Sequence, residues 1–254
     1  MKAGSKKNRR ARTDVPPVQS GPAAVRAMFD RIAPRYDMLN GLLSFRRATV
    51  WRRKVARFVR DDIPIRVLDL ATGTGDQLIA LARHLGNITG GIGIDRSDRM
   101  LDIGRDKMRC HGLENRFELR RGDATDIPFE SESFDVVTIS FGIRNVHDAH
   151  RTLAEMHRIL KPGGRAMVLE FSLPESRSVR TLYLFYFRTI LPWIGGWISG
   201  DREAYRYLNQ TVESFPYGGQ FVDRMRQAGF EGVEANPMTL GVVTIYVGDK
   251  GREG

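Results

Sequence analysis

Cysteine is almost absent from this sequence of 254 residues. Cys110 is the single one, so no internal disulfide framework can form, and no Cys/His group has metal-ligand spacing. A reducing compartment such as the cytoplasm suits that composition. We also expect no secretory signal, because the basic N-terminus continues into Pro16 and Pro17 instead of an apolar core. The sequence therefore argues against a disulfide-rich secreted protein and against a resident metal.

A long hydrophobic run is missing as well. The best candidate for a transmembrane segment, residues 179–198, contains two arginines, a proline and a pair of glycines, so we do not expect a spanning helix. Hydrophobic residues make up 41% of the chain and charged residues 28%, which is ordinary for a globular protein. A chain of this length can bury a full core. The sequence thus predicts one globular domain over residues 21–254.

Acidic residues are too few to balance the basic ones, and the net charge is +10. Residues 1–20 concentrate Lys, Arg, Pro and Ser with few apolar groups, which predicts a disordered basic arm. A second basic cluster, over residues 46–60, gives a predicted helix one cationic face. Positive charge can attract nucleic acid, an anionic membrane surface or an acidic substrate, and the charge alone does not choose among them.

The hydrophobic pattern predicts an α/β fold. A helical pattern dominates residues 23–60, and further helices are expected over residues 77–85, 98–110, 147–160 and 219–228. Strands are expected over residues 66–71, 91–95, 117–121, 134–140, 165–171, 230–235 and 239–247. Strands that alternate with helices indicate a parallel sheet with right-handed crossovers. The last two strands are expected to pair as an antiparallel hairpin at the sheet edge.

The segment VLDLATGTGD, residues 67–76, is the most informative about function. A buried strand leads into a turn that contains Gly73 and Gly75, and a helix begins directly after it. Glycines let the backbone approach a ligand closely, and ligands of open α/β sheets bind at the carboxyl ends of the strands. The helix N-terminus favours a carboxylate or a phosphate. The segment therefore predicts a nucleoside-binding loop.

Three features favour S-adenosylmethionine over NAD as the ligand of this loop. Leu78 stands where the dinucleotide fingerprint has its third glycine. Asp95 ends the second strand, where a carboxylate can accept both ribose hydroxyls, and Asp123 with Ala124 can address an adenine edge. Asp76 adds a negative charge that suits the amino group of a sulfonium cofactor. Taken singly, Asp95 can also be a helix N-cap and Asp123 a turn former.

The sequence resembles the ubiquinone/menaquinone biosynthesis C-methyltransferases from about residue 23 to residue 250. The most discriminating stretches are Tyr36-Asp37-Met38-Leu39-Asn40 with Ser44 and Trp51, and Phe141-Gly142-Ile143-Arg144-Asn145. Residues 68–76, 122–129, 158–165, 169–172, 207–208, 215–216 and 229–230 carry the rest. The sequence departs from the family at Ala48, where His is usual, and at Thr72, where Gly is usual.

This resemblance implies a class I S-adenosylmethionine methyltransferase with a seven-stranded Rossmann-like sheet whose last strand is antiparallel. It also implies N-terminal helices and a helical lid insert. The residues that it places at the cofactor are Thr74, Asp95, Asp123, Ala124 and Ser140. The implied acceptor is a polyprenylated quinol, with conversion of demethylmenaquinol to menaquinol favoured. Another small phenolic or lipid acceptor stays open as the alternative.

Methylation of a ring carbon requires that an adjacent ring hydroxyl, with a pKa of about 10, becomes ionised. Arg144 is a candidate catalytic residue because its guanidinium stabilises a phenolate, and Asn145 can orient the ring. Alternatively, Arg144 is an ion-pair anchor for its loop, and His147 is a competing base. Asp76 either balances the charge of the cofactor or caps its helix. Tyr36 either lines the quinol pocket or packs in the core.

Residues 174–214 form an aromatic-rich helical insert that we expect to cover the acceptor and its polyprenyl tail. Its tryptophans also suit a membrane interface, although an ordinary helical lid would look the same. We expect a cytoplasmic protein, with peripheral contact to the inner face of an anionic membrane as a hypothesis. An oligomer stays open.

A nucleic-acid substrate is not expected despite the basic charge. DNA amino-methyltransferases of this fold usually carry an Asn/Asp-Pro-Pro-Tyr stretch after the fourth strand, and residues 140–143 read Ser-Phe-Gly-Ile instead. RNA cytosine-C5 enzymes need a nucleophilic cysteine, and Cys110 lies in a predicted helix away from the nucleoside loop. A non-catalytic scaffold is disfavoured because the loop and its two carboxylates, Asp95 and Asp123, are intact.

Overall fold

The computed structural model describes residues 21–44, 47–191 and 202–252. The expected disordered arm over residues 1–20 and the two tryptophans at 193 and 197 lie outside the described residues. No helix within the described ranges is long and apolar enough to cross a membrane.

The fold is built on one sheet of seven strands in the order β3-β2-β1-β4-β5-β7-β6. The strands are β1 (Ile65–Leu70), β2 (Ile88–Asp95), β3 (Phe117–Arg121), β4 (Phe134–Ser140), β5 (Leu160–Phe171), β6 (Glu231–Met238) and β7 (Val243–Asp249). Strands β3, β2, β1, β4 and β5 pair in parallel, whereas β7 is antiparallel to both β5 and β6. The predicted seven-stranded sheet with an antiparallel last strand is confirmed.

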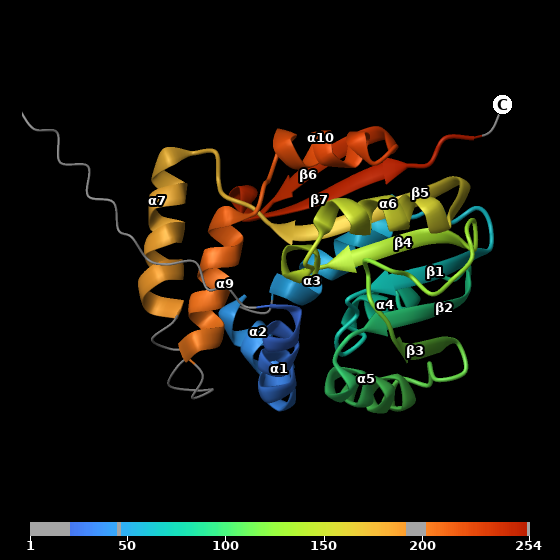
Figure 1. The fold of residues 1–254 in the computed structure, drawn as a ribbon, viewed down its shortest axis with the longest axis horizontal. Helices are drawn as coiled ribbons and strands as arrows, with labels where there is room; N and C mark the ends of the chain where they lie inside the picture. The colour runs from blue at the N-terminus through green and yellow to red at the C-terminus, as the bar shows by residue number, and fades with distance from the viewer. Residues whose placement is uncertain (1–20, 45–46, 192–201, 253–254) are drawn as a thin grey trace, which may run out of the picture.

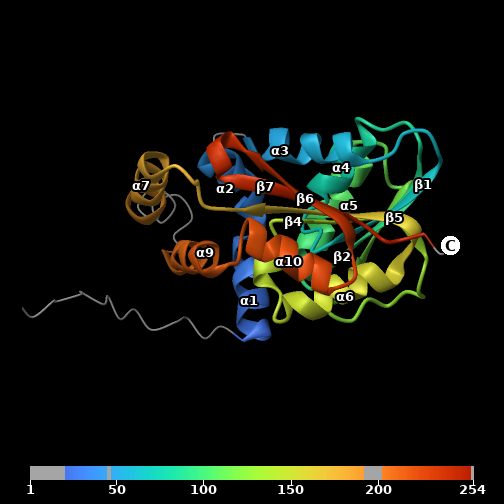
Figure 2. The same ribbon diagram turned by 90° about the horizontal axis from the view of Figure 1, so that it is seen from above.

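Helices cover both faces of the sheet. One face carries α3 (Arg47–Val55) and α4 (Asp76–Ala82), and the other carries α6 (Ala149–Ile159) and α10 (Gly219–Gln227) (Figure 2). The helix α5 (Asp98–Cys110) contributes Leu101 and Met108 to the same buried cluster as α3 and α4. Side-chain caps define two of these helices: Ser97 accepts the backbone N–H of Met100 at the start of α5, and Asp148 accepts that of Arg151 at the start of α6.

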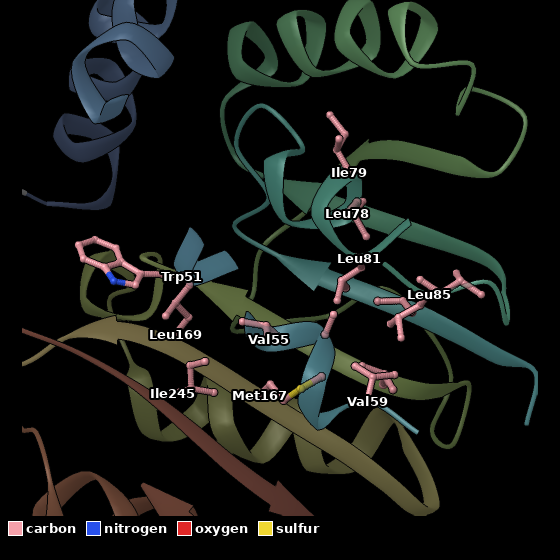
Figure 3. Close-up of a cluster of buried hydrophobic side chains, with 14 of the residues drawn as sticks. Trp51, Val55, Val59, Leu78, Ile79, Leu81, Leu85, Met167, Leu169 and Ile245 are labelled. Carbon is pink, nitrogen blue, oxygen red and sulfur yellow. The ribbon is translucent and has the colours of Figure 1, made fainter. Parts of the chain in front are cut away.

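A buried cluster joins α3 and α4 to the sheet. The side chains that meet there come from α3, α4, the short turn η2 (Ala56–Phe58) and its flank, and strands β5 and β7 (Figure 3). They include Trp51, Val55, Val59, Leu78, Leu81, Leu85, Met167, Leu169 and Ile245. This packing fixes α3 and α4 against each other, and with them the loop that precedes α4.

The predicted helical region 23–60 is divided into several short helices. They are α1 (Pro22–Ile32), the 3-10 turn η1 (Ala33–Arg35), α2 (Tyr36–Leu43), α3 and η2. Pro34 lies in η1, and a proline inside a continuous helix would remove a hydrogen bond and clash with the preceding turn. The break directs α1 and α2 across the end of the sheet.

The remaining helices also gather at the carboxyl ends of the parallel strands. Residues 174–214 contain α7 (Arg177–Phe185), the π-helix η4 (Tyr186–Ile190) and α9 (Arg202–Ser214). Figure 1 shows α1, α2, α7 and α9 beyond the edge of the sheet toward which β4 points. The expected start of the last strand at Thr239 is wrong, because Thr239–Gly241 form a turn (η5) with positive φ angles, and β7 begins at Val243.

Candidate active site

The loop between β1 and α4 has a backbone that few residues can adopt. Ala71, Gly73 and Gly75 all have positive φ angles, of 48°, 55° and 77°. A Cβ atom at Gly75 would lie 2.7 Å from the Cε atom of Met108 on α5. Glycine is therefore favoured at position 75 by the backbone conformation, whereas the flexible end of the Met108 side chain could move to make room for a Cβ atom. The helix α4 begins immediately after, at Asp76.

A first cavity, of about 100 Å³, lies over the ends of β1, β2 and β4. The structure brings five of the predicted cofactor residues together in its lining: Gly73, Asp95, Asp123, Ala124 and Ser140. The helix α1 closes the cavity with Val25, Arg26 and Phe29. An elongated polar ligand that lies across the carboxyl edge of the sheet would contact all these elements.

Asp95 joins two loops under this cavity. Its carboxylate accepts the N–H of Gly73 at 2.8 Å and the N–H of Ser97 at 2.9 Å. Burial raises the pKa of Asp95, and the backbone hydrogen bonds oppose that effect. Because Ser97 is the N-cap of α5, the alternative role of Asp95 as the cap does not apply. A carboxylate has about four acceptor positions, so Asp95 can still accept hydroxyls from a ligand.

Asp123 combines a turn with a place in the cavity. It accepts the backbone N–H of Thr125 at 2.9 Å and its hydroxyl at 2.8 Å, and it lies 3.6 Å from the guanidinium of Arg96. Burial raises the pKa of Asp123, but the Thr125 hydrogen bonds and Arg96 outweigh burial and lower it overall. Asp123 therefore forms a turn and also lines the cavity, so the two roles considered for it are compatible.

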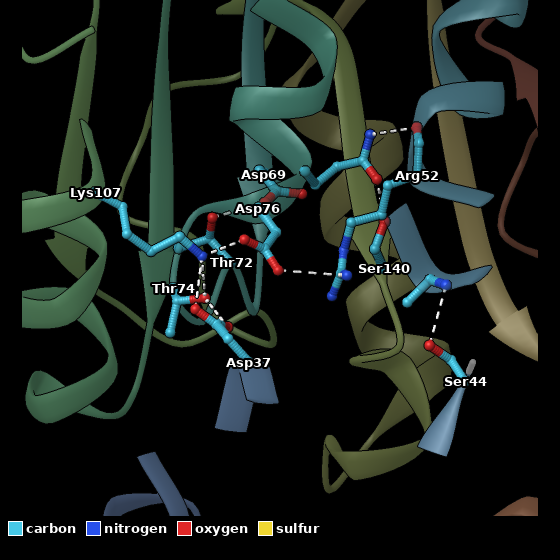
Figure 4. A network of polar contacts seen from close by, with 11 residues as sticks. Asp37, Ser44, Arg52, Asp69, Thr72, Thr74, Asp76, Lys107 and Ser140 are labelled. Atoms are coloured by element: carbon cyan, nitrogen blue, oxygen red, sulfur yellow. Dashed lines mark hydrogen bonds and ion pairs between the residues drawn. The ribbon is translucent and has the colours of Figure 1, made fainter. Parts of the chain in front are cut away.

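A charged network surrounds Thr74 and Asp76 at the start of α4. The Thr74 hydroxyl donates to Asp37 of α2 at 2.8 Å, and the ammonium of Lys107 donates to Thr74, to Asp37 and to Asp76. Arg52 lies 3.4 Å from the other oxygen of Asp76 (Figure 4). Asp76 thus stands between two cations. It is the first residue of α4 and makes no capping hydrogen bond.

Asp69 is a buried carboxylate beneath the same loop. It is 1% exposed and accepts the hydroxyls of Thr72 and Thr138, each at 2.6 Å. Burial raises the pKa of Asp69 to about 6, although both hydrogen bonds act to lower it. A small cavity of about 20 Å³ is lined by Asp69, Arg52, Asp76 and nearby residues, and it shares Tyr36, Ala71, Gly73 and Ser140 with the first cavity.

A second and larger cavity, of about 280 Å³, is mostly apolar. Its lining comes from α1, α2, α3, the ends of β4 and β5, and the 174–214 insert. The insert contributes Tyr183, Tyr186, Phe187, Leu191, Tyr207 and Leu208. Four residues line both this cavity and the first one: Phe29, Tyr36, Phe141 and Asn145. The two cavities therefore meet at a shared wall, and Tyr36 is part of that wall.

Arg144 and Asn145 line the second cavity from the turn η3 (Ile143–Asn145). The Arg144 guanidinium pairs with Glu170, which is fully buried, and it lies 5.3 Å from the centre of the Phe171 ring. Arg144 and Asn145 both donate to the carbonyl oxygen of Phe141, at 2.9 and 3.3 Å. Within the described residues, Arg144 Nε and Asn145 Oδ1 are buried without a hydrogen-bond partner.

Phe141 organises this corner from an unusual backbone conformation. Its φ angle is +57°, which is rare for a bulky residue and occurs mostly at functional sites. Its N–H donates to the carbonyl oxygen of Leu169 at 2.7 Å, and its ring packs on Trp51 and Phe171. The strained residue thereby turns its own carbonyl oxygen toward Arg144.

Comparison with known proteins assigns the family. Residues 18–250 match the ubiE/COQ5 methyltransferase family. The chain belongs to that family. A ubiquinone/menaquinone biosynthesis C-methyltransferase UbiE of Geobacter sulfurreducens is 45% identical over 227 residues, which cover 89% of this chain and 88% of the relative. A demethylmenaquinone methyltransferase of Thermus thermophilus is 44% identical over 223 residues, covering 88% and 100%.

Solved structures agree on the fold. A Thermotoga maritima S-adenosylmethionine-dependent methyltransferase superposes with a TM-score of 0.62 at 23% identity, covering 88% of this chain and 99% of that one. A Haemonchus contortus phosphoethanolamine N-methyltransferase superposes with a TM-score of 0.63 at 15% identity, covering 90% and 60%. These likenesses confirm the predicted class I methyltransferase fold. Family membership confirms the predicted enzyme class and S-adenosylmethionine as the cofactor.

The cavities of this ubiE/COQ5 methyltransferase fit that cofactor. Asp95 and Asp123 line the first cavity, where their carboxylates would offer acceptors to a ribose and an adenine. The adjoining small cavity holds Asp69, Asp76 and Arg52, which offers both signs of charge to the ammonium and carboxylate of a methionine moiety. Thr74 lies in the small cavity and not in the first one.

Several residues of this methyltransferase site were not among those predicted from the sequence. Arg52, Lys107, Asp69, Glu170 and Tyr183 all line the cavities or pair with residues that do. Only Asp69 carried a usable signal, because it is a carboxylate in the last two residues of the apolar strand before the glycine loop.

Three other expectations can be compared with the structure. His147, the competing base, is exposed and lines neither of the two cavities. Arg52, one of the basic residues of the predicted cationic face over residues 46–60, is 7% exposed and lines the second cavity. Ala48, where the family usually has His, is 8% exposed and lines the second cavity.

Proposed function

We propose that the protein transfers a methyl group from S-adenosylmethionine to a ring carbon of a polyprenylated quinol, with demethylmenaquinol as the favoured acceptor. The names of its relatives, at 44–45% identity, supply the acceptor class. The observation that carries the proposal is the wall that the nucleoside cavity shares with the apolar cavity. Cofactor and acceptor can meet only where two such cavities adjoin, since methyl transfer is an in-line displacement.

Arg144 and Asn145 have roles that follow from their free atoms. The bound cofactor supplies an electrophilic methyl group, and the ring carbon becomes nucleophilic when the neighbouring hydroxyl ionises. Arginine keeps its proton, so Arg144 stabilises the phenolate while the hydroxyl proton passes to solvent water. After methyl transfer the ring carbon loses its own proton and the ring oxygen regains one, so that one proton in all is released to solvent. The free Oδ1 of Asn145 can accept a hydrogen bond from a ring hydroxyl, because its amide nitrogen is already turned toward Phe141.

The 174–214 insert is proposed to cover the acceptor. Phe187 and Leu191 are each 3% exposed, and with Tyr183 and Tyr207 they give the second cavity an apolar wall. Each methylene of an isoprenoid chain that such a wall buries contributes about 0.8 kcal/mol. The same wall keeps water away from the phenolate, so that the charge of Arg144 acts with little screening.

A direct assay tests this proposal. Labelled S-adenosylmethionine is offered with a short-chain demethylmenaquinol, with a demethylated benzoquinol, or with a simple phenol. We expect label in the naphthoquinol product. Arg144→Ala should abolish transfer while changing the affinity for adenosylhomocysteine by no more than about twofold. The exposed Arg224→Ala serves as the matched control. Cofactor binding by the wild type without transfer to either quinol would refute the acceptor assignment, and normal turnover by Arg144→Ala would remove Arg144 from the mechanism.

We also propose peripheral contact with an anionic membrane surface. Leu182 and Phe185 of α7 are 70% and 57% exposed, and Ile190 of η4 is 36% exposed, close to residues that line the acceptor cavity. The net charge of +10 suits anionic lipid. Flotation should carry the protein with anionic liposomes more than with neutral ones, and Leu182→Ser with Phe185→Ser should weaken this, unlike Ile63→Ser. Recovery of the wild type only in the soluble fraction would contradict the proposal.

A further inference from the structure

Three buried polar atoms without a partner belong to residues that line one cavity. They are Arg144 Nε, Asn145 Oδ1 and the hydroxyl of Tyr183, and none has a hydrogen-bond partner within the described residues. Buried polar groups in native proteins are nearly always hydrogen-bonded, because an unsatisfied one costs about 1–3 kcal/mol. Three such atoms around one cavity indicate a ligand that satisfies them. The proposed mechanism uses the first two and leaves Tyr183 unexplained.

The Tyr183 ring is held firmly in the wall of the cavity. It stacks on Phe187 with centroids 5.2 Å apart and planes at 27°, and Phe187 packs on Phe171 at 6.4 Å. The Arg144 guanidinium lies over the same Phe171 ring. This aromatic row connects α7 to the end of β5. The hydroxyl of Tyr183 therefore has a fixed position relative to Arg144.

The Tyr183 hydroxyl is suited to donate a hydrogen bond. Burial raises the pKa of Tyr183 above its usual value, and the nearby Arg144 offsets this only in part. The group consequently keeps its proton at neutral pH. A hydrogen-bond donor beside a guanidinium suits an oxygen atom of the ligand. A positively charged ligand group is not expected there, because Arg144 would repel it.

We propose that Tyr183 donates a hydrogen bond to the second ring oxygen of the acceptor, the one that does not activate the methylated carbon. This inference rests on the proposed function. Only the hydroxyl next to the methylated carbon needs to ionise. Asn145 Oδ1 accepts its hydrogen bond before ionisation, and Arg144 stabilises the phenolate that results. The other oxygen of a quinol lies on the opposite side of the ring. It therefore needs a partner other than the residues that follow β4. Contact from α7 there makes the enzyme selective for 1,4-dihydroxy rings over monophenols.

The matched substrate pair is a short-chain demethylmenaquinol and 3-prenyl-1-naphthol, which lacks only the second oxygen. A site built to bind a hydroxyl discriminates strongly against a ligand without it, because its own polar group is then left unpaired. We expect the wild type to prefer the quinol by about tenfold or more in kcat/KM. Tyr183→Phe should lose about tenfold on the quinol, mainly in KM, and little on the naphthol.

The controls separate this role from a structural one. Tyr217→Phe makes the same chemical change outside both cavities and should leave both substrates unaffected. Thermal unfolding and adenosylhomocysteine binding of Tyr183→Phe should match the wild type. Equal losses on both substrates, or no loss on the quinol, would overturn the role of Tyr183. A wild type that methylates both compounds equally well would also overturn it, without any variant. A wild type that methylates neither compound would overturn the proposed function as well.

Discussion

Removing Glu170 alone should destabilise the protein far more than removing Glu170 and Arg144 together. The Glu170 side chain is fully buried and that of Arg144 is 8% exposed, so the two charges depend on each other. A buried ion left without its partner costs about 3–5 kcal/mol, whereas replacing both partners by apolar side chains is often neutral. We therefore expect Glu170→Ala to lower the free energy of unfolding by about 4 kcal/mol.

The double variant, with methionine at both positions, retains a smaller loss. Glu170 also accepts the backbone N–H of Phe171 at 2.9 Å and, at 3.4 Å, that of Arg144. At about 1 kcal/mol for each of these hydrogen bonds, the double variant should lose about 1–2 kcal/mol. The difference between the two variants is then about 2–3 kcal/mol, or roughly 4–12 °C in Tm for a chain of this size.

Equilibrium urea unfolding, followed by tryptophan fluorescence, measures both free energies. Methyl transfer should be lost in both variants, since the guanidinium is either absent or no longer held. A double variant as unstable as Glu170→Ala would refute the view that the unpaired charge causes the loss. A cost below about 1 kcal/mol for Glu170→Ala would show that Arg144 does not depend on this partner.

Two further predictions concern the cofactor loop. Because the pKa of Asp69 is about 6 in the folded protein against 3.8 ordinarily, the folded state binds this proton more tightly. Its stabilising effect is fully present below pH 3.8 and is lost as the pH rises through 6. The stability of the wild type relative to Asp69→Asn should therefore fall by about 2 kcal/mol between pH 4 and pH 7 in urea unfolding. A pH-independent difference would contradict this. A Cβ at Gly142 would lie 2.7 Å from the Cβ of Ala71, so Gly142→Ala should destabilise by about 1–3 kcal/mol and weaken adenosylhomocysteine binding in calorimetry, while Gly219→Ala, with nothing within 4 Å, should do neither. If Gly142→Ala, like Gly219→Ala, lowered neither the stability nor the adenosylhomocysteine affinity, the loop would tolerate the added Cβ atom and the prediction would be wrong.

Local patterns were enough to predict most of the sheet. The strands at 117–121 and 134–140 and the helix at 98–110 have the predicted bounds, because their apolar periodicity is regular and their neighbours are turn formers or caps. The helical region 23–60 was predicted less well. Its apolar pattern continues through Pro34, and only the backbone chemistry of that proline divides it.

Part of the site was predictable from the strand ends, and several residues that act in pairs were missed. Asp95 and Asp123 could be placed because the carboxyl ends of neighbouring strands converge. Glu170 could not, since its partner Arg144 lies 26 residues away and nothing in either segment marks the pair. Lys107 lies 31 residues from Asp76, on a helix that reads as an ordinary amphipathic one. Such pairs are decided by tertiary packing.

The wall of Phe29, Tyr36, Phe141 and Asn145 has a consequence for how the two substrates influence each other. If the bound cofactor changes the affinity for the acceptor by some factor, the bound acceptor must change the affinity for the cofactor by the same factor. The demethylated nucleoside left after each turnover would occupy the same cavity and reach the same four side chains. Through this shared wall, the affinity for one product would then depend on whether the other is still bound.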